Sequence, residues 1–155
     1  MKLDILVFGA HPDDVELGCG GTIIKEVQKG KNVGIIDLTR GELGTRGNIK
    51  TRNSEANKAT KILGVSIREN MNFKDGFLKD DEKHKIKLIR KIRQYCPEII
   101  LTNAISDRHP DHSKSAQITI DSSFLSGLEK IDTGQAIWRP KAIFHYIQFN
   151  NLIPD

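Results

Sequence analysis

The sequence predicts an α/β fold, with a Rossmann-like, mostly parallel β-sheet that carries helices on both faces. Short apolar runs alternate along the chain with longer segments whose apolar residues recur at helical spacing. Because parallel strands need a crossover between them, this alternation favours β-α-β units with right-handed connections. The chain has 155 residues, without an internal repeat or an interdomain linker, so we expect a single domain over residues 1–155.

Each strand of the predicted sheet is a short apolar run. Residues 3–8 are almost continuously apolar, which is typical of a parallel strand buried on both faces. We expect the other strands at residues 33–38, 68–73, 98–103 and 142–147. Helices are expected over residues 17–28, 50–63, 82–95 and 113–123, and Gly30 and Gly64 are placed to end the first two.

The charge pattern argues against a nucleic-acid partner. Lys and Arg outnumber Asp and Glu by 24 to 20, a mildly basic balance that also suits an anionic small molecule. Only 6% of residues are aromatic, which leaves no stacking platform for single strands. The basic segment 82–95 has apolar residues on one side and cations, Arg93 among them, around the rest. We interpret it as an amphipathic helix with a solvated face rather than a nucleic-acid helix.

Cysteine use and hydropathy indicate a cytoplasmic protein. Cys19 and Cys96 lie in different contexts and form no C-x-x-C pair, so we predict two reduced thiols. No apolar run approaches the length of a membrane span or the core of a signal peptide. We therefore expect no membrane partner.

The first motif that carries chemistry is Gly-Ala-His-Pro-Asp-Asp at residues 9–14, directly after the first strand. His11 and Asp14 offer an imidazole and a carboxylate three residues apart, so one short loop can aim both at a single divalent cation. Pro12 restricts the backbone between them. Asp13 supplies a second carboxylate that the cation does not need and that is free to act as a base.

A third ligand is expected because a catalytic zinc usually has three protein ligands and leaves a fourth position to water or substrate. The candidate is His112, in Asp-Arg-His-Pro-Asp-His at residues 107–112, which follows the apolar run 99–101. If the two strands are neighbours, their loops meet at the carboxyl edge of the sheet, where ligands bind in open parallel sheets. Histidine and carboxylate ligands suit several metals, so zinc, iron and manganese remain open.

With both motifs in view, the chain resembles the PIG-L/LmbE-like family of zinc-dependent N-acetylglucosamine deacetylases. The resemblance rests on residues 9–14, on Thr-Arg-Gly-Glu at 39–42 and on His-Pro-Asp-His at 109–112. Within that family it resembles the branch that deacetylates N-acetylglucosaminyl-malate in bacillithiol biosynthesis, through Leu-Thr-Arg-Gly-Glu-Leu-Gly-Thr-Arg-Gly at 38–47, residues 107–112 and Trp-Arg-Pro-Lys-Ala at 138–142. Family members continue further, so we expect an LmbE-like deacetylase domain that lacks its C-terminal part, without a closing helix after the last strand.

The resemblance implies roles for the residues of both motifs. Each subunit would bind one metal ion through His11, Asp14 and His112. The ion would be Zn²⁺, with Fe²⁺ or another divalent metal as the alternative. Asp13 would be the general base and His109 a second catalytic histidine, with Asp111 as partner of His109 or of a ligand. The alternative for Asp13 is a helix cap. His84 and His145 lie outside both motifs and are expected to be structural. The resemblance also implies a homo-oligomer, commonly a hexamer.

The expected reaction is hydrolytic removal of the N-acetyl group from an N-acetylglucosamine-type glycoside, most readily N-acetylglucosaminyl-malate, an anionic sugar. Another N-acetylglucosamine conjugate is the alternative substrate. The malyl carboxylates suit the rigid fork of arginine, which favours Arg52 and Arg139. The full set of candidates for holding substrate is Glu42, Arg46, Arg52, Asp75 and Arg139. For each of these the alternative is ordinary loop charge.

Two other classes are weighed against the hydrolase. In a dinucleotide-binding module, Gly18-Cys19-Gly20-Gly21 would cradle a pyrophosphate and Asp37 would bind a ribose, but these glycines come about ten residues after the first strand and form no G-x-G-x-x-G. A non-catalytic zinc domain would need four protein ligands, typically with cysteine, and neither motif places Cys19 or Cys96 for that purpose.

Overall fold

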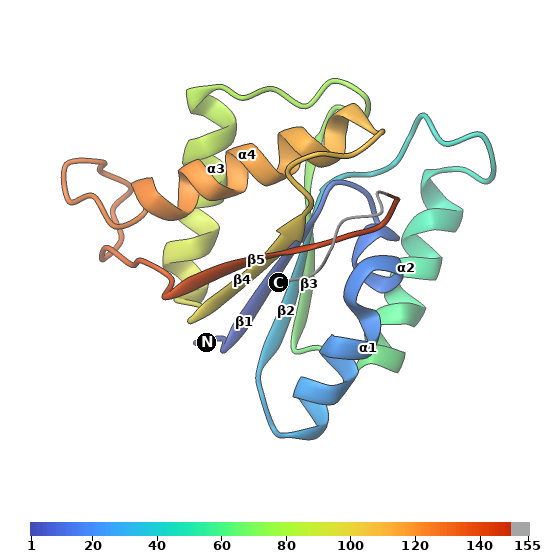
Figure 1. The fold of residues 1–155 in the computed structure, drawn as a ribbon, viewed down its shortest axis with the longest axis horizontal. Helices are drawn as coiled ribbons and strands as arrows, with labels where there is room; N and C mark the ends of the chain where they lie inside the picture. The colour runs from blue at the N-terminus through green and yellow to red at the C-terminus, as the bar shows by residue number, and fades with distance from the viewer. Residues whose placement is uncertain (150–155) are drawn as a thin grey trace.

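The computed structural model describes residues 1–149, which form one five-stranded sheet with four helices (Figure 1). The strands are β1 (Ile5–Gly9), β2 (Val33–Thr39), β3 (Ile67–Phe73), β4 (Ile99–Asn103) and β5 (Ala142–Tyr146). The helices are α1 (Asp14–Gln28), α2 (Ile49–Leu63), α3 (Glu82–Tyr95) and α4 (Pro110–Leu125). All strand pairs are parallel, which confirms the predicted α/β class. The expected lack of a closing helix falls on residues 150–155, outside the described residues.

The sheet is the middle layer of three. Figure 1 shows α1 and α2 over one face and α3 and α4 over the other. Neighbouring residues of β1 serve opposite faces, as the twofold repeat of a strand requires. Val7 packs with Val15 and Ile23 of α1, whereas Phe8 packs with residues of α3 and α4 such as Ile92. This burial on both sides explains the continuous apolar runs of β1 and β2.

The strand order β3-β2-β1-β4-β5 places the two motif-bearing strands side by side. β1 pairs with β4 in parallel register, with Ile5 opposite Ile99 and Val7 opposite Leu101. The chain runs outward from β1 to β3 on one side and from β4 to β5 on the other, so the order reverses between β1 and β4. In open parallel sheets this reversal opens a crevice at the carboxyl ends of the strands, where ligands bind. The predicted neighbourhood of the two strands is confirmed.

Two helices begin earlier than their apolar patterns indicate. α1 begins at Asp14 rather than at residue 17, and α4 begins at Pro110 rather than at residue 113. Proline is well accommodated in the first helical turn, where its missing N–H is not needed. The imidazole of His109 caps α4, with its Nδ1 accepting from Asp111 N at 3.2 Å. Both motifs therefore end inside a first helical turn, which holds Asp14 and His112 on rigid elements.

α3 confirms the amphipathic interpretation, with one exception. Leu88, Ile89 and Ile92 are fully buried against the sheet. Arg93, expected on the solvated side, is also buried. Its guanidinium donates to the backbone carbonyls of Ser126, Leu128 and Ile131 and to Thr133 Oγ1. Arg93 thus supplies hydrogen-bond donors to the loop after α4. The helix pattern could not predict this role, because it depends on a contact that forms only in the folded protein.

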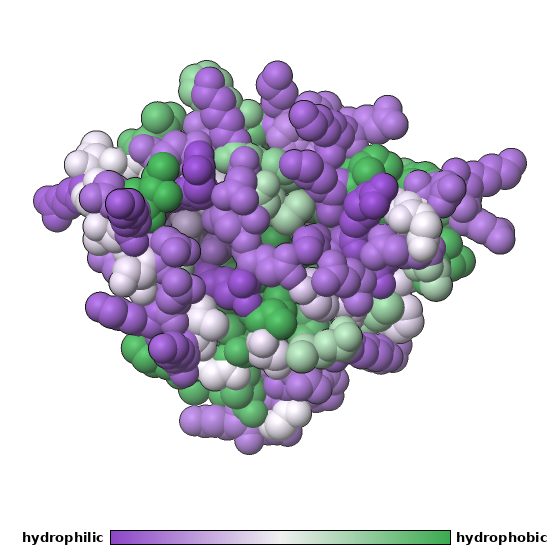
Figure 2. Space-filling view, turned by 180° about the vertical axis from the view of Figure 1, so that it is seen from behind, coloured by the Kyte–Doolittle hydropathy of each residue, from purple (hydrophilic) through white to green (hydrophobic). Residues whose placement is uncertain are grey.

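The surface agrees with the interspersed charges of the sequence. Figure 2 shows one face of the molecule, which is mostly hydrophilic with apolar residues in small, scattered patches. In the part of the chain that the structure describes, no helix is long and apolar enough to span a bilayer. Cys19 and Cys96 are both free thiols, as predicted.

Close packing joins the end of β5 to α1. The Tyr146 hydroxyl donates to Phe8 O at 2.9 Å, and its ring lies directly against Gly18 of α1. A Cβ built at Gly18 would lie 2.3 Å from Tyr146 Cδ2. Because Tyr146 is buried and held by its hydroxyl, the ring cannot easily move aside. Glycine at position 18 is therefore required by contact rather than by backbone conformation.

We predict that Gly18→Ala lowers the free energy of unfolding by about 1–3 kcal/mol, because overpacking outweighs the gain in helix propensity. Gly21→Ala is the matched control on the same helix, since a Cβ there meets no atom within 4 Å. That substitution should leave stability unchanged or raise it by up to about 1 kcal/mol. Urea denaturation of the two variants decides, and equal midpoints would contradict the packing argument.

Candidate metal centre

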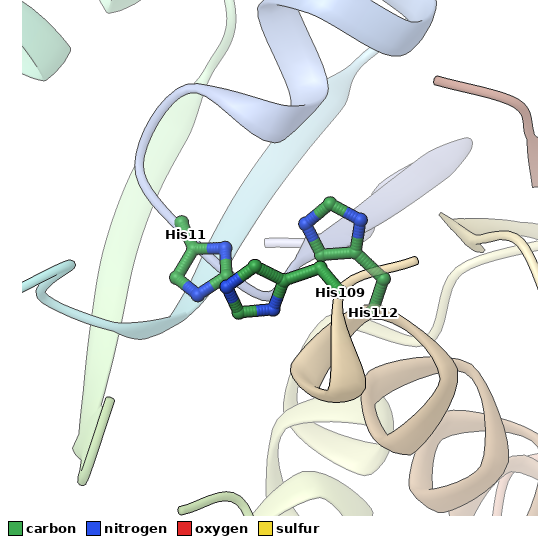
Figure 3. A group of neighbouring side chains, drawn as sticks. All are labelled: His11, His109 and His112. Carbon is green, nitrogen blue, oxygen red and sulfur yellow. The ribbon is translucent and has the colours of Figure 1, made fainter. Parts of the chain in front are cut away.

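The two motifs, about 100 residues apart in sequence, converge at the carboxyl edge of the sheet. Figure 3 shows His11 on the loop after β1 and His109 and His112 at the start of α4, with the three imidazoles facing one another. The ring centroids are 4.6 Å apart for His11 and His109, 5.4 Å for His11 and His112, and 4.9 Å for His109 and His112. The pairing of β1 with β4 therefore builds one compact histidine cluster.

Asp14 links the two imidazoles that the sequence names as ligands. Its Oδ2 lies 3.4 Å from His11 Nδ1, and its Oδ1 lies 3.2 Å from His112 Nε2. All three side chains are buried. Each oxygen of the Asp14 carboxylate thus faces one imidazole nitrogen of the predicted ligand set.

The remaining nitrogen of each of these imidazoles faces another carboxylate. His11 Nε2 lies 3.0 Å from Asp75 Oδ1 and 3.4 Å from Asp111 Oδ2. His112 Nδ1 lies 3.2 Å from Asp107 Oδ1. Carboxylates placed in this way fix the orientation and tautomer of metal-binding histidines. The donor set therefore fits a divalent cation between His11 Nδ1, Asp14 and His112 Nε2.

The groups of side chains whose ligand atoms lie closest together combine His11 with neighbours other than Asp14. Among the described residues, His11, His109 and His112 form one group whose ligand atoms all lie within 4.8 Å of one another, and His11, Asp75 and Asp111 form a second. Both groups contain His11. The structure therefore supports a cation site centred on His11, and the choice among its neighbours rests on the chemistry of the family.

The electrostatics describe a site charged by protons when no metal is bound. Burial opposes protonation of His11, but Asp111 and Asp14 outweigh it and raise the pKa to about 10. Burial likewise opposes a charge on His112, and Asp14 and Asp107 raise its pKa. Burial would raise the pKa of Asp14, but His11 and His112 lower it. The carboxylates thus favour protonation of both imidazoles, and a cation that binds their nitrogens has to displace any proton held there.

His109 behaves in the opposite way. Burial lowers its pKa, and the positive charges of His11 and His112 lower it further. Its Nδ1 accepts a hydrogen bond from Asp111 N, so in the neutral ring the proton lies on Nε2. The second histidine of the motif, His109, is therefore a neutral hydrogen-bond donor through Nε2 beside the cation site.

Asp13 is not used to cap the helix. It occupies the N-cap position of α1, yet its side chain accepts no capping hydrogen bond. The side chain is 51% exposed, and its Oδ2 lies 3.7 Å from Arg52 Nη1. The structure therefore gives no support to the helix-cap alternative and leaves this carboxylate available to a ligand.

A pocket of about 590 Å³ lies beside Asp13, between α1 and the loop and helix that follow β2. Arg46 and Arg52, two of the residues expected to hold substrate, line it. A second pocket, of about 310 Å³, lies between the end of β3 and α2 and shares Pro12 with the first. Pro12 and Asp13 thus connect these pockets to the loop that carries His11 and Asp14 (residues 9–14, the metal loop), while the proposed ligands themselves line neither pocket.

Two hydrogen bonds from backbone N–H groups join the segment at Glu42 and Leu43 to Asp75, next to the cluster. Glu42 Oε1 accepts from Asp75 N at 3.1 Å, and Asp75 Oδ2 accepts from Leu43 N at 2.8 Å. The other oxygen of Glu42, Oε2, is buried and has no hydrogen-bond partner within the described residues. This unpartnered acceptor is available to a hydroxyl group.

Arg139 is the one candidate that this chain does not bring to the cluster. It donates to Phe124 O at 3.1 Å and lies over the Phe124 ring, at the last turn of α4. His112 is in the first turn of the same helix, so about 20 Å of helix separates the two. The fork of Arg139 is engaged by a helix terminus rather than directed at a ligand.

Several residues around Asp14 and His112 were missed by sequence reasoning. Asn103 Nδ2 and Gln148 Nε2 each donate to Asp14, and Asp107 faces His112. Asn103 and Asp107 lie at the end of β4 and in its loop, where the parallel-sheet rule predicts ligands and could have indicated them. Gln148 follows β5 without any local motif, and only the fold reveals its position.

Asp37, which a dinucleotide-binding module would need for a ribose, is engaged elsewhere. Both of its oxygens accept from Arg68, at 2.8 Å and 2.9 Å. Arg68 also donates to Pro12 O at 3.1 Å and to Glu16. Asp37 is buried and therefore serves to anchor the metal loop through Arg68. The dinucleotide alternative gains no support from this geometry.

The chain is similar to a known protein family and to known proteins over most of its length. The family model PIG-L, described as GlcNAc-PI de-N-acetylase, matches residues 6–123. An uncharacterized deacetylase, YaiS of Escherichia coli, is 36% identical over 119 residues, which are 70% of this chain and 61% of that protein. The crystal structure of the conserved protein TT1542 from Thermus thermophilus has a TM-score of 0.94 at 38% identity and covers 98% of this chain and 69% of its own.

Relatives with named substrates are more distant. Diacetylchitobiose deacetylase of Thermococcus kodakarensis is 29% identical over 143 residues, which are 86% of this chain and 54% of that protein. A probable N-acetyl-α-D-glucosaminyl L-malate deacetylase of Bacillus anthracis is 26% identical over 129 residues, which are 73% of this chain and 56% of that protein. The chain thus spans little more than half of these two relatives. Because the family match covers both histidine motifs and most of the sheet, the chain belongs to the PIG-L family of GlcNAc-PI de-N-acetylases.

Proposed function

We propose that this protein is a metal-dependent N-deacetylase that hydrolyses the acetamido group of an N-acetylglucosamine-type glycoside. The observation that carries the proposal is that Asp14 faces both His11 and His112, one with each oxygen. Asp13, which precedes Asp14 in the chain, has a carboxylate that does not cap the helix. Three protein ligands, with the fourth position left to water or substrate, are typical of catalytic rather than structural zinc sites. Relatives named as deacetylases support the same reaction.

We propose zinc as the metal, held by His11, Asp14 and His112. When bound in such a site, zinc lowers the pKa of water to about 7 and polarises a carbonyl oxygen. The chain's contribution is to hold the ligands rigidly, because Asp14 and His112 lie in first helical turns and Asp75, Asp107 and Asp111 face the remaining imidazole nitrogens.

Asp13 is the proposed general base. Its carboxylate has no backbone partner and borders the larger pocket, so it can take the proton of the attacking water. Arg52, 3.7 Å away, restrains its position without a close ion pair. The Nε2–H of His109, fixed by the bond from Asp111 N to Nδ1, is placed to donate a hydrogen bond to the oxyanion. The proton that Asp13 takes from the water is then passed to the departing amine.

N-acetylglucosaminyl-malate is the substrate that we propose, and another N-acetylglucosamine conjugate is the alternative. Arg46 and Arg52 in the pocket supply positive charge for the malyl carboxylates. The unpartnered Glu42 Oε2 supplies an acceptor for a sugar hydroxyl, and Asp75 holds Glu42 in place. We also propose that the protein forms a homo-oligomer, a hexamer as the family resemblance implies. Sedimentation velocity tests this oligomeric state.

The division of roles between ligand and base is tested by metal content. We expect Asp13→Asn and Asp13→Ala to retain zinc but to lose about 10²–10⁴-fold in kcat, as removal of a general base does. His11→Ala should lose zinc itself. Elemental analysis of the purified variants and an amine-release assay measure both effects. Loss of zinc from the Asp13 variants would overturn the assignment, since Asp13 makes no capping hydrogen bond that holds the loop.

Metal uptake should release protons near neutral pH. The pKa of His11 is raised to about 10, so below that pH the imidazole is protonated in the metal-free protein and must lose its proton to bind. The apparent affinity for Zn²⁺ therefore rises with pH between about 6 and 9. Titration calorimetry in buffers of different ionisation enthalpy measures the release, and heats independent of the buffer would contradict it.

Recognition of a carboxylate is tested at Arg52, with Arg139 as its control. Arg52→Lys keeps the charge but loses the fork, so we expect KM for N-acetylglucosaminyl-malate to rise about tenfold, and KM for free N-acetylglucosamine to rise much less. Arg139→Lys should leave KM for both substrates near that of the parent, since Arg139 of the same chain donates to Phe124 O. Equal effects of Arg52→Lys on the two substrates would defeat the assignment.

A further inference from the structure

Two neutral amides donate hydrogen bonds to the carboxylate of Asp14. Asn103 Nδ2 donates to Asp14 Oδ2 at 3.1 Å, and Gln148 Nε2 donates to Asp14 Oδ1 at 3.1 Å. The two amides are also joined, since Asn103 Nδ2 donates to Gln148 Oε1 at 3.1 Å. Each oxygen of Asp14 therefore receives its own amide donor, and the plane of the carboxylate is fixed.

Asn103 reaches both ends of the metal loop. It lies at the end of β4 and is fully buried. Its Oδ1 accepts from Ala10 N at 3.0 Å, while its Nδ2 binds Asp14. One side chain on the sheet thus holds the residue before His11 and the ligand after it. Removal of this side chain would leave Ala10 N without its acceptor and would take away one of the donors to Asp14 Oδ2.

The two oxygens of Asp14 are not equivalent. Oδ2 already accepts from two neutral donors, His11 N at 2.9 Å and Asn103 Nδ2. Oδ1 accepts from one neutral donor, Gln148 Nε2, and faces His112. A carboxylate oxygen has about two lone-pair sites, so Oδ1 keeps one for a cation. The neutral amides also leave the negative charge of Asp14 intact, whereas Lys or Arg at these positions would offset it.

We infer that Asn103 and Gln148 are positioning residues, an amide clamp that presents Oδ1 of Asp14 to a divalent cation shared with His11 and His112. The inference rests on the proposed function, because it concerns a ligand of that site. It also makes the residue two positions after β5 part of the centre, although no motif contains Gln148. Partners of metal ligands typically change metal affinity by about 10–100-fold when they are removed.

Gln148→Met tests the clamp, because it keeps the length of the side chain and removes only the amide. We expect the Kd for Zn²⁺ and Co²⁺ to rise about tenfold. The visible spectrum of the Co²⁺ protein should also change, because a freed Asp14 can rotate and alter the coordination. Gln117→Met is the matched control, since Gln117 Nε2 also donates to a carboxylate, Asp121 Oδ1, but on an exposed part of α4.

Asn103→Ala extends the test and is expected to raise Kd further than Gln148→Met, with a non-additive effect in the double variant. Because Asn103 is buried, that variant can fail to fold, and Gln148→Met then decides alone. Competition with a chelator gives Kd, and circular dichroism checks that each variant is folded. A Kd within twofold of the parent and an unchanged Co²⁺ spectrum for Gln148→Met overturn the clamp. Failure of the parent to bind either metal overturns the proposed function instead.

Discussion

The parallel pairing of β1 with β4 is the constraint on which the site depends. Each strand delivers one histidine motif to the same edge of the sheet, and the order reversal between them opens the space that a ligand needs. Adjacent strands lie about 4.8 Å apart, so a single inserted strand would displace one motif by that distance. Metal–ligand bonds are about 2 Å long, and no rearrangement of side chains would compensate for such a shift.

Burial makes the cluster depend on charge compensation. Several carboxylates and three histidines gather where water is largely excluded, and an isolated charge there would be costly. The neighbouring carboxylates raise the pKa of both His11 and His112 against the effect of burial. A divalent cation would offset the same buried negative charge. The site is therefore built to accept a cation without a change of fold, and Arg68 and the two amides keep the loop in place.

The sequence was sufficient to predict the fold and the meeting of the two histidine motifs, because both follow local rules. Continuous apolar runs predicted buried strands such as β1, and the two His-Pro-Asp motifs predicted where the chemistry lies. The starts of α1 and α4 were predicted three residues too late, because the prediction relied on the apolar pattern. The first residues of these helices, Asp14 and Pro110, do not belong to that pattern. Arg93 and Gln148 were beyond prediction, because each binds a partner that only tertiary structure brings near. Arg139 carried the right chemistry but lies at the wrong end of α4.

The most direct test of the account is to locate the metal itself by anomalous X-ray diffraction at the zinc absorption edge. The account predicts one peak per chain, about 2.0–2.2 Å from His11 Nδ1, Asp14 Oδ1 and His112 Nε2, with no fourth protein ligand. A peak bound by other side chains, or one enclosed by four protein ligands, would contradict it.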